Sequence, residues 1–463
     1  MMARYQGHHS YGTGINRKGI AIPLQTGTSV HEPVDVIASY CKKRRIEEPE
    51  VPTTTLMDEL IDQNIVRDAI EDVNATYVDI VDKTGLKQLT EIPEDIDALV
   101  TEQCTLVGGL VWTWVLELLP WVLDHYEIIA VEQEFERILA CTCGLGEIGD
   151  AATHEERGCN GVCLMTRPDL ILRHLISGIL VYVELKTGAD VKNKNYEMQY
   201  EDNIQFALGA AAVEYTLGEP IQELYVHALH KGKRSQTKNF STGEWEGPKK
   251  QNSSLCYVFY KEDNPPLEKG DIRPNYYTTD PETGRRWGAT IKRGYYKTPL
   301  WEVPLPGHEP GVPYFEHWVR NVMDAGDLLD HYAMIGPIKN PHFLVERLVV
   351  EMAEEELRWQ QRLDYLDVVL EECAGDRTHQ DFQHALMQVI PRSWKCYNYG
   401  GWCEYQTICF QREGWDDPLG EKSDIAHAKY ERRTPNHPIE INAEGYKNGE
   451  ADRTESGAGQ VSE

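Results

Sequence analysis

Three charged residues lie in a segment of the chain that is otherwise apolar. In RPDLILRHLISGILVYVELKTG, residues 167–188, Asp169 follows a proline, and Glu184 and Lys186 stand at the end of an apolar run. Side chains alternate along a strand, so Glu184 and Lys186 would share one face while Leu185 points to the other. A carboxylate and an ammonium at the end of a buried strand cost stability unless they are paired or used.

The chemistry available to these residues is metal-assisted hydrolysis of a phosphodiester. Two carboxylates brought together repel each other unless a cation lies between them. Asp169 and Glu184 offer the hard oxygen ligands that Mg²⁺ or Mn²⁺ prefers, and both ions also take phosphate oxygens. Lys186 could orient the attacking water or neutralise charge that builds on the phosphate. A Glu-x-Lys match alone is weak, because an ion pair at the end of a surface strand has the same pattern.

The elements that must position these residues form an α/β arrangement. The two halves of the segment, VCLMTRPDLILR and GILVYVELKT, read as an antiparallel hairpin joined by HLISG. Residues 195–218 read as a helix that ends at Gly218, and a strand follows in IQELYVHALHKGKR. Residues 127–143 alternate like one strand that places three carboxylates on one face: Glu132, Glu134 and Glu136.

The whole chain has 463 residues, which suits one large decorated domain or two. We expect a central mixed sheet flanked by helices, with helical additions at both ends. The predicted segments are a flexible N-terminus at 1–30, an acidic helical region at 31–104, the α/β core at 105–235, strands and loops at 236–342, a long helix and a cysteine-containing region at 343–430, and a disordered tail at 431–463.

Net charge is −29, but the charge is unevenly distributed. Residues 46–102 hold 16 acidic and 3 basic residues, whereas residues 231–297 hold 14 basic and 8 acidic ones. The global sign therefore does not exclude nucleic acid as a partner. The most apolar stretch, LVGGLVWTWVLELLPWVL, contains a glutamate and a proline and reads as a buried helix. No secretory signal is recognisable, so we expect a cytoplasmic protein that does not bind membranes.

The motif residues resemble those of a known family, the PD-(D/E)xK nucleases of the RecB-like branch. Pro168-Asp169 resembles the Asp motif, and Glu184-Leu185-Lys186 resembles the (D/E)xK motif. NIQFALGAAAVE resembles the glutamine-containing helix of this branch, so Gln205 is implied as a supporting catalytic residue. Gly209 stands where the family usually has Tyr. The branch often has a His on the helix before the first strand, where this chain has two tryptophans, Trp112 and Trp114.

This resemblance implies a restriction-endonuclease-like core and a metal-dependent deoxyribonuclease. Asp169 and Glu184 would hold Mg²⁺ or Mn²⁺, and Lys186 would position the water. We expect an exonuclease that acts on single- or double-stranded DNA in phage-type recombination, repair or processing, in the host cytoplasm if a phage encodes it. The alternative is a non-catalytic DNA-binding or scaffold protein that keeps the fold. The sequence contains no pattern that indicates partner proteins, cleavage polarity or strand preference.

The C-terminal cysteines add a second resemblance. SWKCYNYGGWCEYQTICF spaces Cys396, Cys403 and Cys409 as at the end of the iron–sulfur nucleases of this branch, such as AddB-type proteins. In those proteins, one cysteine before the core and three after it bind a [4Fe–4S] cluster, and thiolates are suitable ligands for iron. Cys41 is the most natural fourth ligand, with Cys104 and Cys373 as alternatives. Three cysteines packed in a core would give the same composition.

A second cysteine group and a basic segment have less specific signals. Four cysteines lie at the two ends of one predicted hairpin: Cys141, Cys143, Cys159 and Cys163. They could hold Zn²⁺, as in a zinc-ribbon regulator, or they could be unpaired cysteines of the strands. Lys231, Lys233 and Arg234 could contact DNA phosphates or form a solvated turn. Tyrosine-rich stretches such as RGYYKTPLW could stack on bases, but such aromatics are more often part of a core.

Overall fold

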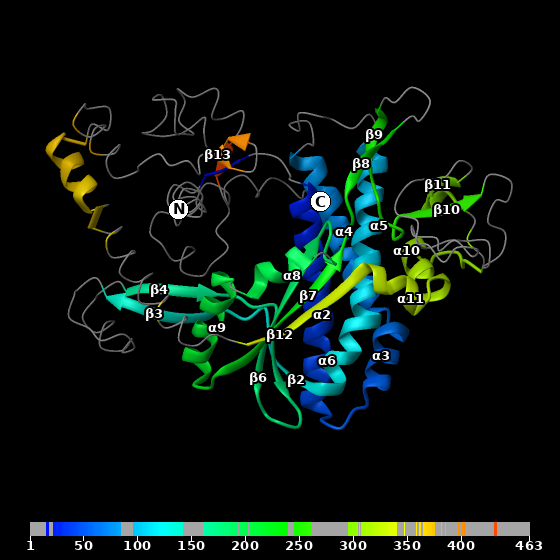
Figure 1. Ribbon diagram of the computed structural model, residues 1–463, viewed down its shortest axis with the longest axis horizontal. Helices are drawn as coiled ribbons and strands as arrows, with labels where there is room; N and C mark the ends of the chain where they lie inside the picture. The colour runs from blue at the N-terminus through cyan, green and yellow to red at the C-terminus, as the bar shows by residue number, and fades with distance from the viewer. Residues whose placement is uncertain are drawn as a thin grey trace, which may run out of the picture. The chain divides into compact units, whose positions relative to one another are not determined.

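The computed structural model describes residues 15–17, 22–84, 96–141, 161–192, 194–201, 203–238, 245–261 and 295–339 without 304 and 306, and short pieces or single positions between 347 and 432. The chain divides into two compact units. One comprises Ile20–Arg358, and the other comprises Met1–Gly19 with Trp359–Glu463. The central sheet, with the helices that pack on it, belongs to the first unit (Figure 1).

A five-stranded mixed sheet forms the centre of this unit, which confirms the predicted α/β class. Its strand order is β12-β7-β6-β5-β2. Strands β6 and β7 run parallel, and the other neighbours are antiparallel. The predicted hairpin is present as β5 and β6. The bounds are Tyr126–Val131 for β2, Leu170–His174 for β5, Leu180–Gly188 for β6, Ile221–His230 for β7 and Tyr332–Lys339 for β12.

A layer of helices covers one face of the sheet (Figure 1). These helices are α2 (Ile22–Glu47), α3 (Thr53–Asp62), α4 (Ile65–Thr84), α5 (Ile96–Thr113) and α6 (Leu119–His125). A π-helical turn at Trp114–Leu118 joins the last two. By length and composition, Asp97–His125 could cross a membrane, but most of its apolar stretch is buried inside the protein. The prediction of a buried helix is therefore confirmed.

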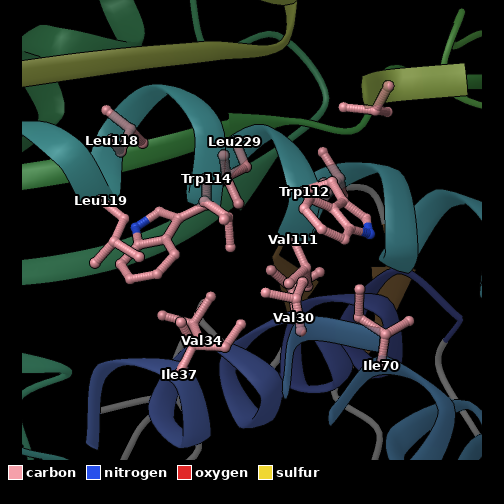
Figure 2. Close-up of a cluster of buried hydrophobic side chains, with 14 of the residues drawn as sticks. Val30, Val34, Ile37, Ile70, Val111, Trp112, Trp114, Leu118, Leu119 and Leu229 are labelled. Atoms are coloured by element: carbon pink, nitrogen blue, oxygen red, sulfur yellow. The ribbon is translucent and has the colours of Figure 1, made fainter. Parts of the chain in front are cut away.

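The core between this layer and the sheet follows from alternation along the strands. Val181, Val183 and Leu185 of β6 are buried in the same cluster as residues of α2 and α5. Figure 2 shows Val30, Val34 and Ile37 of α2 facing Val111, Trp112 and Trp114 of the α5 segment, with Leu229 of β7 nearby. The helices predicted for the acidic region 31–104 thus share one core with the sheet.

The other face of the sheet carries a smaller core. Tyr182 of β6 and Val226 of β7 pack with Phe206 and Val213 of α9. The predicted helix 195–218 consists of two helices, α8 (Lys194–Glu201) and α9 (Ile204–Leu217). Gly218 follows α9 with φ of 69°, the left-handed conformation that suits a glycine at a helix end.

The prediction of one strand over residues 127–143 is wrong. Strand β2 ends at Val131, and Glu132 has φ of 44°, which turns the chain out of the central sheet. Strand β3 (Phe135–Cys141) then pairs with β4 (Gly161–Thr166) in a separate two-stranded sheet. Glu132 is therefore a turn residue at the edge of the central sheet rather than one position in a continuous strand.

The remaining strands of the first unit form two small hairpins within the strand and loop region predicted for 236–342. They are β8 (Arg234–Lys238) with β9 (Trp245–Gln251) and β10 (Tyr257–Lys261) with β11 (Tyr295–Pro299). Short helical turns connect β11 to β12: Leu300–Glu302, α10 (Tyr314–His317), Trp318–Val322, α11 (Ala325–Leu328) and Leu329–His331.

In the second unit, β1 (Ile15–Arg17) pairs with β15 (Tyr430–Arg432), and β13 (Tyr397–Asn398) pairs with β14 (Gly401–Trp402). Residues 364–372, inside the predicted long helix, are helical. The flexible N-terminus predicted for 1–30 is wrong at its boundary, because α2 begins at Ile22.

Candidate metal centre

Three side chains from distant parts of the chain converge beside the end of β6. Within the described ranges, His31, Glu132 and Asp169 each offer a ligand atom, and these atoms lie within 4.8 Å of one another. His31 comes from α2, Glu132 directly follows β2, and Asp169 directly precedes β5. Two carboxylates and an imidazole are a donor set that suits Mn²⁺ and, through the oxygens, Mg²⁺.

Asp169 is held by hydrogen bonds to both of its carboxylate oxygens. His31 Nδ1 lies 2.7 Å from Oδ1, and the backbone N–H of Leu185 donates to Oδ2. The second bond fastens Asp169 to β6 one residue after Glu184. Asp169 is buried, and the backbone N–H of Glu132 donates to its carbonyl oxygen over 3.1 Å. Asp169 is therefore held between the end of β2, the start of β5 and the backbone of β6.

Glu132 is oriented by a neighbouring cation, the guanidinium of Arg167. Arg167 Nε lies 2.6 Å from Glu132 Oε2 and donates to the Glu132 carbonyl oxygen over 3.0 Å. The left-handed backbone at Glu132 carries an energetic cost for a residue with a side chain. Such strain at a non-glycine residue is found preferentially at functional positions.

Glu184 and Lys186 lie on one face of β6, as predicted, with Glu184 in the middle of the strand and Lys186 two residues further on. Lys186 Nζ donates to Glu184 Oε1, and the Tyr182 hydroxyl donates to Oε2 over 3.2 Å. Glu184 is buried, and it is not part of the group of three ligand atoms. His31 and Glu132, which were not predicted as ligands, thus join Asp169 in this group, and the predicted pairing of Asp169 with Glu184 as ligands stays a prediction.

Burial and mutual repulsion shift the pKa values of these carboxyl groups. Burial, followed by the charge of Asp169, raises the pKa of Glu184. Burial and the neighbouring Asp169 raise the pKa of Glu132 to about 7. Burial acts in the same direction on Asp169, but the hydrogen bond and charge of His31, together with the hydrogen bonds from Glu132 and the Leu185 backbone, outweigh it and lower the pKa of Asp169. Burial would lower the pKa of His31, but the bond to Asp169 raises it.

Asp35 adds a further carboxyl group one turn along α2 from His31. Its Oδ1 atom is buried and has no hydrogen-bond partner among the described residues. Burial, then the charges of Glu132 and Asp169, raise the pKa of Asp35 to about 9. Several carboxyl groups that repel one another in a half-buried position are the electrostatic setting that a divalent cation relieves.

The other predicted catalytic residue and the glycine of the same motif both lie on α9. Gln205 is in the first turn of this helix. Gly209 faces β6, because a Cβ atom at this position would lie 2.9 Å from the Tyr182 hydroxyl oxygen.

The predicted DNA-binding residues differ in their surroundings. Lys233 is exposed. Lys231 Nζ lies 3.5 Å from Thr187 Oγ1 near the end of β6, and burial lowers its pKa. Arg234 NH2 lies 3.3 Å from a carboxylate oxygen of the buried Glu102, so this guanidinium is already engaged within the protein.

The cysteines fall into buried and undescribed positions. Cys41 is fully buried in the core between α2 and the sheet, where burial raises the pKa of its thiol to about 12. This position favours a packing role over ligation of a cluster. The three C-terminal cysteines, Cys396, Cys403 and Cys409, lie outside the described residues. Cys104 and Cys373 are half-buried.

The proposed zinc cysteines are described only in part. Cys141 lies at the end of β3 and Cys163 lies on β4, so both belong to one hairpin. The register pairs Cys141 with Gly161 and Ile138 with Cys163, so the two cysteines are not directly opposite each other. Cys143 and Cys159 lie outside the described residues.

Comparison with known proteins adds no relative. No family model matches the chain, and neither the curated proteins nor the solved structures contain a match.

His31 and the role of Glu132 were missed in the sequence. His31 and Asp35 are four residues apart on a helix, so a shared helical face was the available signal. No local pattern connects His31 with Asp169, which is 138 residues away. Glu132 was recognised only as one of three acidic residues in a strand, and its turn conformation has no marker in the sequence.

Proposed function

We propose that this protein is a metal-dependent DNA nuclease with a restriction-endonuclease-like core. The observation that carries the proposal is the convergence of His31, Glu132 and Asp169 beside the Glu184–Lys186 pair at one end of β6. Asp169, Glu132 and His31 would hold the cation, and Glu184, which the sequence predicts as a ligand, would be a further ligand beside them. The mixed sheet with helices on both faces is compatible with this fold class.

The residues around the cation would divide the remaining work. A bound divalent cation supplies Lewis acidity at the phosphate. Lys186 carries a positive charge to the same end of β6, where it can stabilise negative charge that develops on the phosphate oxygens. Glu184 holds the Lys186 ammonium in place through their direct hydrogen bond. Arg167 fixes the Glu132 carboxylate through their ion pair.

The test is cleavage of end-labelled single- and double-stranded DNA with Mg²⁺, with Mn²⁺ and with chelator. Asp169→Asn and Lys186→Ala should each reduce metal-dependent cleavage by at least 100-fold. Glu219→Gln is the matched control. Glu219 is an exposed carboxylate that pairs with Arg173, and it lies just before β7, at the end of the sheet opposite to the candidate site. DNA binding without cleavage by the wild-type protein would favour the non-catalytic alternative. Release of mononucleotides from ends would support exonuclease action.

The proposal also includes a [4Fe–4S] cluster bound by Cys396, Cys403 and Cys409. Its support is the resemblance in sequence, together with the fact that iron–sulfur clusters are held by cysteine thiolates. Cys41, the fourth ligand that the resemblance implies, is buried in an apolar core, where burial raises the pKa of its thiol to about 12. Iron content and visible absorbance of protein purified without oxygen test this assignment.

A further inference from the structure

The hydroxyl of Tyr182 lies between β6 and α9, next to the candidate metal centre. The Tyr182 side chain is 3% exposed, and its ring packs in the smaller core with Phe206. The hydroxyl donates to Glu184 Oε2 over 3.2 Å and also hydrogen-bonds the side chain of Thr166. A phenol that is buried so deeply needs polar partners, and here a carboxylate of the candidate site is one of them.

The space for this hydroxyl exists because position 209 on α9 has no side chain. A Cβ at Gly209 would lie 2.9 Å from the Tyr182 hydroxyl oxygen and 3.0 Å from Thr166 Oγ1. Both distances are too short for ordinary contacts of a methyl group. Gly209 does not have the left-handed backbone that usually requires glycine, and it lies inside a helix, where glycine costs about 1 kcal/mol relative to alanine. Close approach to Tyr182 explains its presence.

The hydroxyl completes the hydrogen bonding of Glu184. One carboxylate oxygen accepts from Lys186 and the other accepts from Tyr182. Both donors project from the same face of β6 as Glu184, two residues before and two residues after it. A carboxylate held at both oxygens by side chains of its own strand has little freedom to rotate, and groups that orient ligands in this way tune metal affinity.

We propose that Tyr182 is a positioning residue, which fixes the Glu184 carboxylate toward the metal centre, and that Gly209 is present to leave room for its hydroxyl. The role in metal binding rests on the proposed function, whereas the contact between Tyr182 and Gly209 does not. The two parts can therefore be tested separately.

The first experiment measures Mn²⁺ binding by calorimetry in the absence of DNA. Tyr182→Phe keeps the ring and removes only the hydroxyl, so Mn²⁺ affinity should fall about 10-fold, within the range for groups that orient ligands. The matched control is Tyr257→Phe, which removes another buried tyrosine hydroxyl that donates to a buried carboxylate, that of Glu102, which is not among the ligand atoms of the centre. This control should bind Mn²⁺ as the wild type does.

The second experiment tests the contact through thermal stability. Gly209→Ala should lower the melting temperature, because the added methyl group collides with the hydroxyl. Tyr182→Phe should remove only part of this loss in the double variant, since it removes the closest contact, whereas Thr166 Oγ1 stays 3.0 Å and the ring atom Cε2 3.3 Å from the Cβ position. In the Tyr182→Phe background, Gly209→Ser returns a hydroxyl to the same space and should recover part of the Mn²⁺ affinity.

Wild-type Mn²⁺ affinity in Tyr182→Phe would overturn the positioning role. Additive effects of Tyr182→Phe and Gly209→Ala on the melting temperature would overturn the explanation of Gly209. If Tyr182→Phe weakens Mn²⁺ binding as expected but the wild-type protein never cleaves DNA, the positioning role is supported and the nuclease proposal is rejected.

Discussion

The Asp169 carboxylate is hydrogen-bonded to groups that belong to the two faces of the sheet. One oxygen is bonded to His31, which comes from the helical layer on one face. The other accepts from the backbone of Leu185, between Glu184 and Lys186, which project toward the opposite face. A substitution of this residue therefore disturbs both groups at once.

His31 should be required for metal binding. His31→Gln removes the imidazole and should lower Mn²⁺ affinity at least 10-fold, since even groups that only orient ligands contribute 10- to 100-fold. Calorimetry with Mn²⁺ measures the change. His174→Gln is the control, because His174 is bonded to Ser177 in the exposed β5–β6 turn. Equal Mn²⁺ binding by wild-type protein and His31→Gln would exclude His31 as a ligand.

Asp35 should make the metal-free protein less stable as pH rises. Its folded pKa of about 9 and that of Glu132, about 7, lie above the ordinary values of 3.8 and 4.5. The folded state then binds more protons than the unfolded state between these values, so the free energy of unfolding falls with rising pH. His31, whose pKa is also raised, acts in the same direction above pH 6.5.

Asp35→Asn should reduce this slope by up to about 1.4 kcal/mol per pH unit, the slope that one proton produces. Urea unfolding of the metal-free protein from pH 5 to pH 9 measures it. Asp330→Asn provides a control, because Lys192 Nζ lies 3.2 Å from that carboxylate. An unchanged slope in Asp35→Asn would mean that Asp35 ionises normally.

At the scale of elements, the turn after β2 determines where Glu132 lies. A left-handed backbone costs a non-glycine residue about 1 kcal/mol. Glu132→Gly should therefore raise the stability of the metal-free protein by about that amount while lowering Mn²⁺ affinity. Glu132→Ala should lower the affinity without the gain in stability. Thermal unfolding and calorimetry give the two quantities, and equal melting temperatures of the two variants would rule out strain at this turn.

The sequence predicts the elements well where the signal is local. The apolar alternation of β5, β6 and β7 and the helical pattern before Gly218 correspond to elements of the structure, and the Glu184–Lys186 pair shares a face as expected. The turn at Glu132 is unpredictable because glutamate rarely adopts positive φ. His31 was missed because contacts between distant segments depend on packing that no local pattern records.

At the scale of the whole molecule, the unevenly distributed charge is compatible with a DNA partner. The acidic residues 46–102 lie mostly on the helices α3 and α4 and the start of α5, whereas Lys231 and Lys233 lie beside the end of β7. Lys233→Glu should weaken DNA binding several-fold, with a stronger effect at low salt, because contacts to phosphate release counterions.

Arg234→Gln should instead lower stability, because it leaves the buried Glu102 without its cation. Fluorescence anisotropy at two salt concentrations and thermal unfolding separate these effects.

Metal binding should stabilise the first unit as a whole, because His31, Glu132 and Asp169 are far apart in the sequence and meet only in the folded state. A ligand that binds the folded state alone adds about 2.7 kcal/mol at 100 times its dissociation constant. Mn²⁺ should therefore raise the melting temperature of the wild type by several degrees and leave Asp169→Asn almost unchanged. Glu219→Gln, at an exposed ion pair, should respond as the wild type does. If Mn²⁺ stabilised Asp169→Asn and the wild type equally, the cation would be bound elsewhere, and the proposed centre would be wrong even if the protein cleaved DNA.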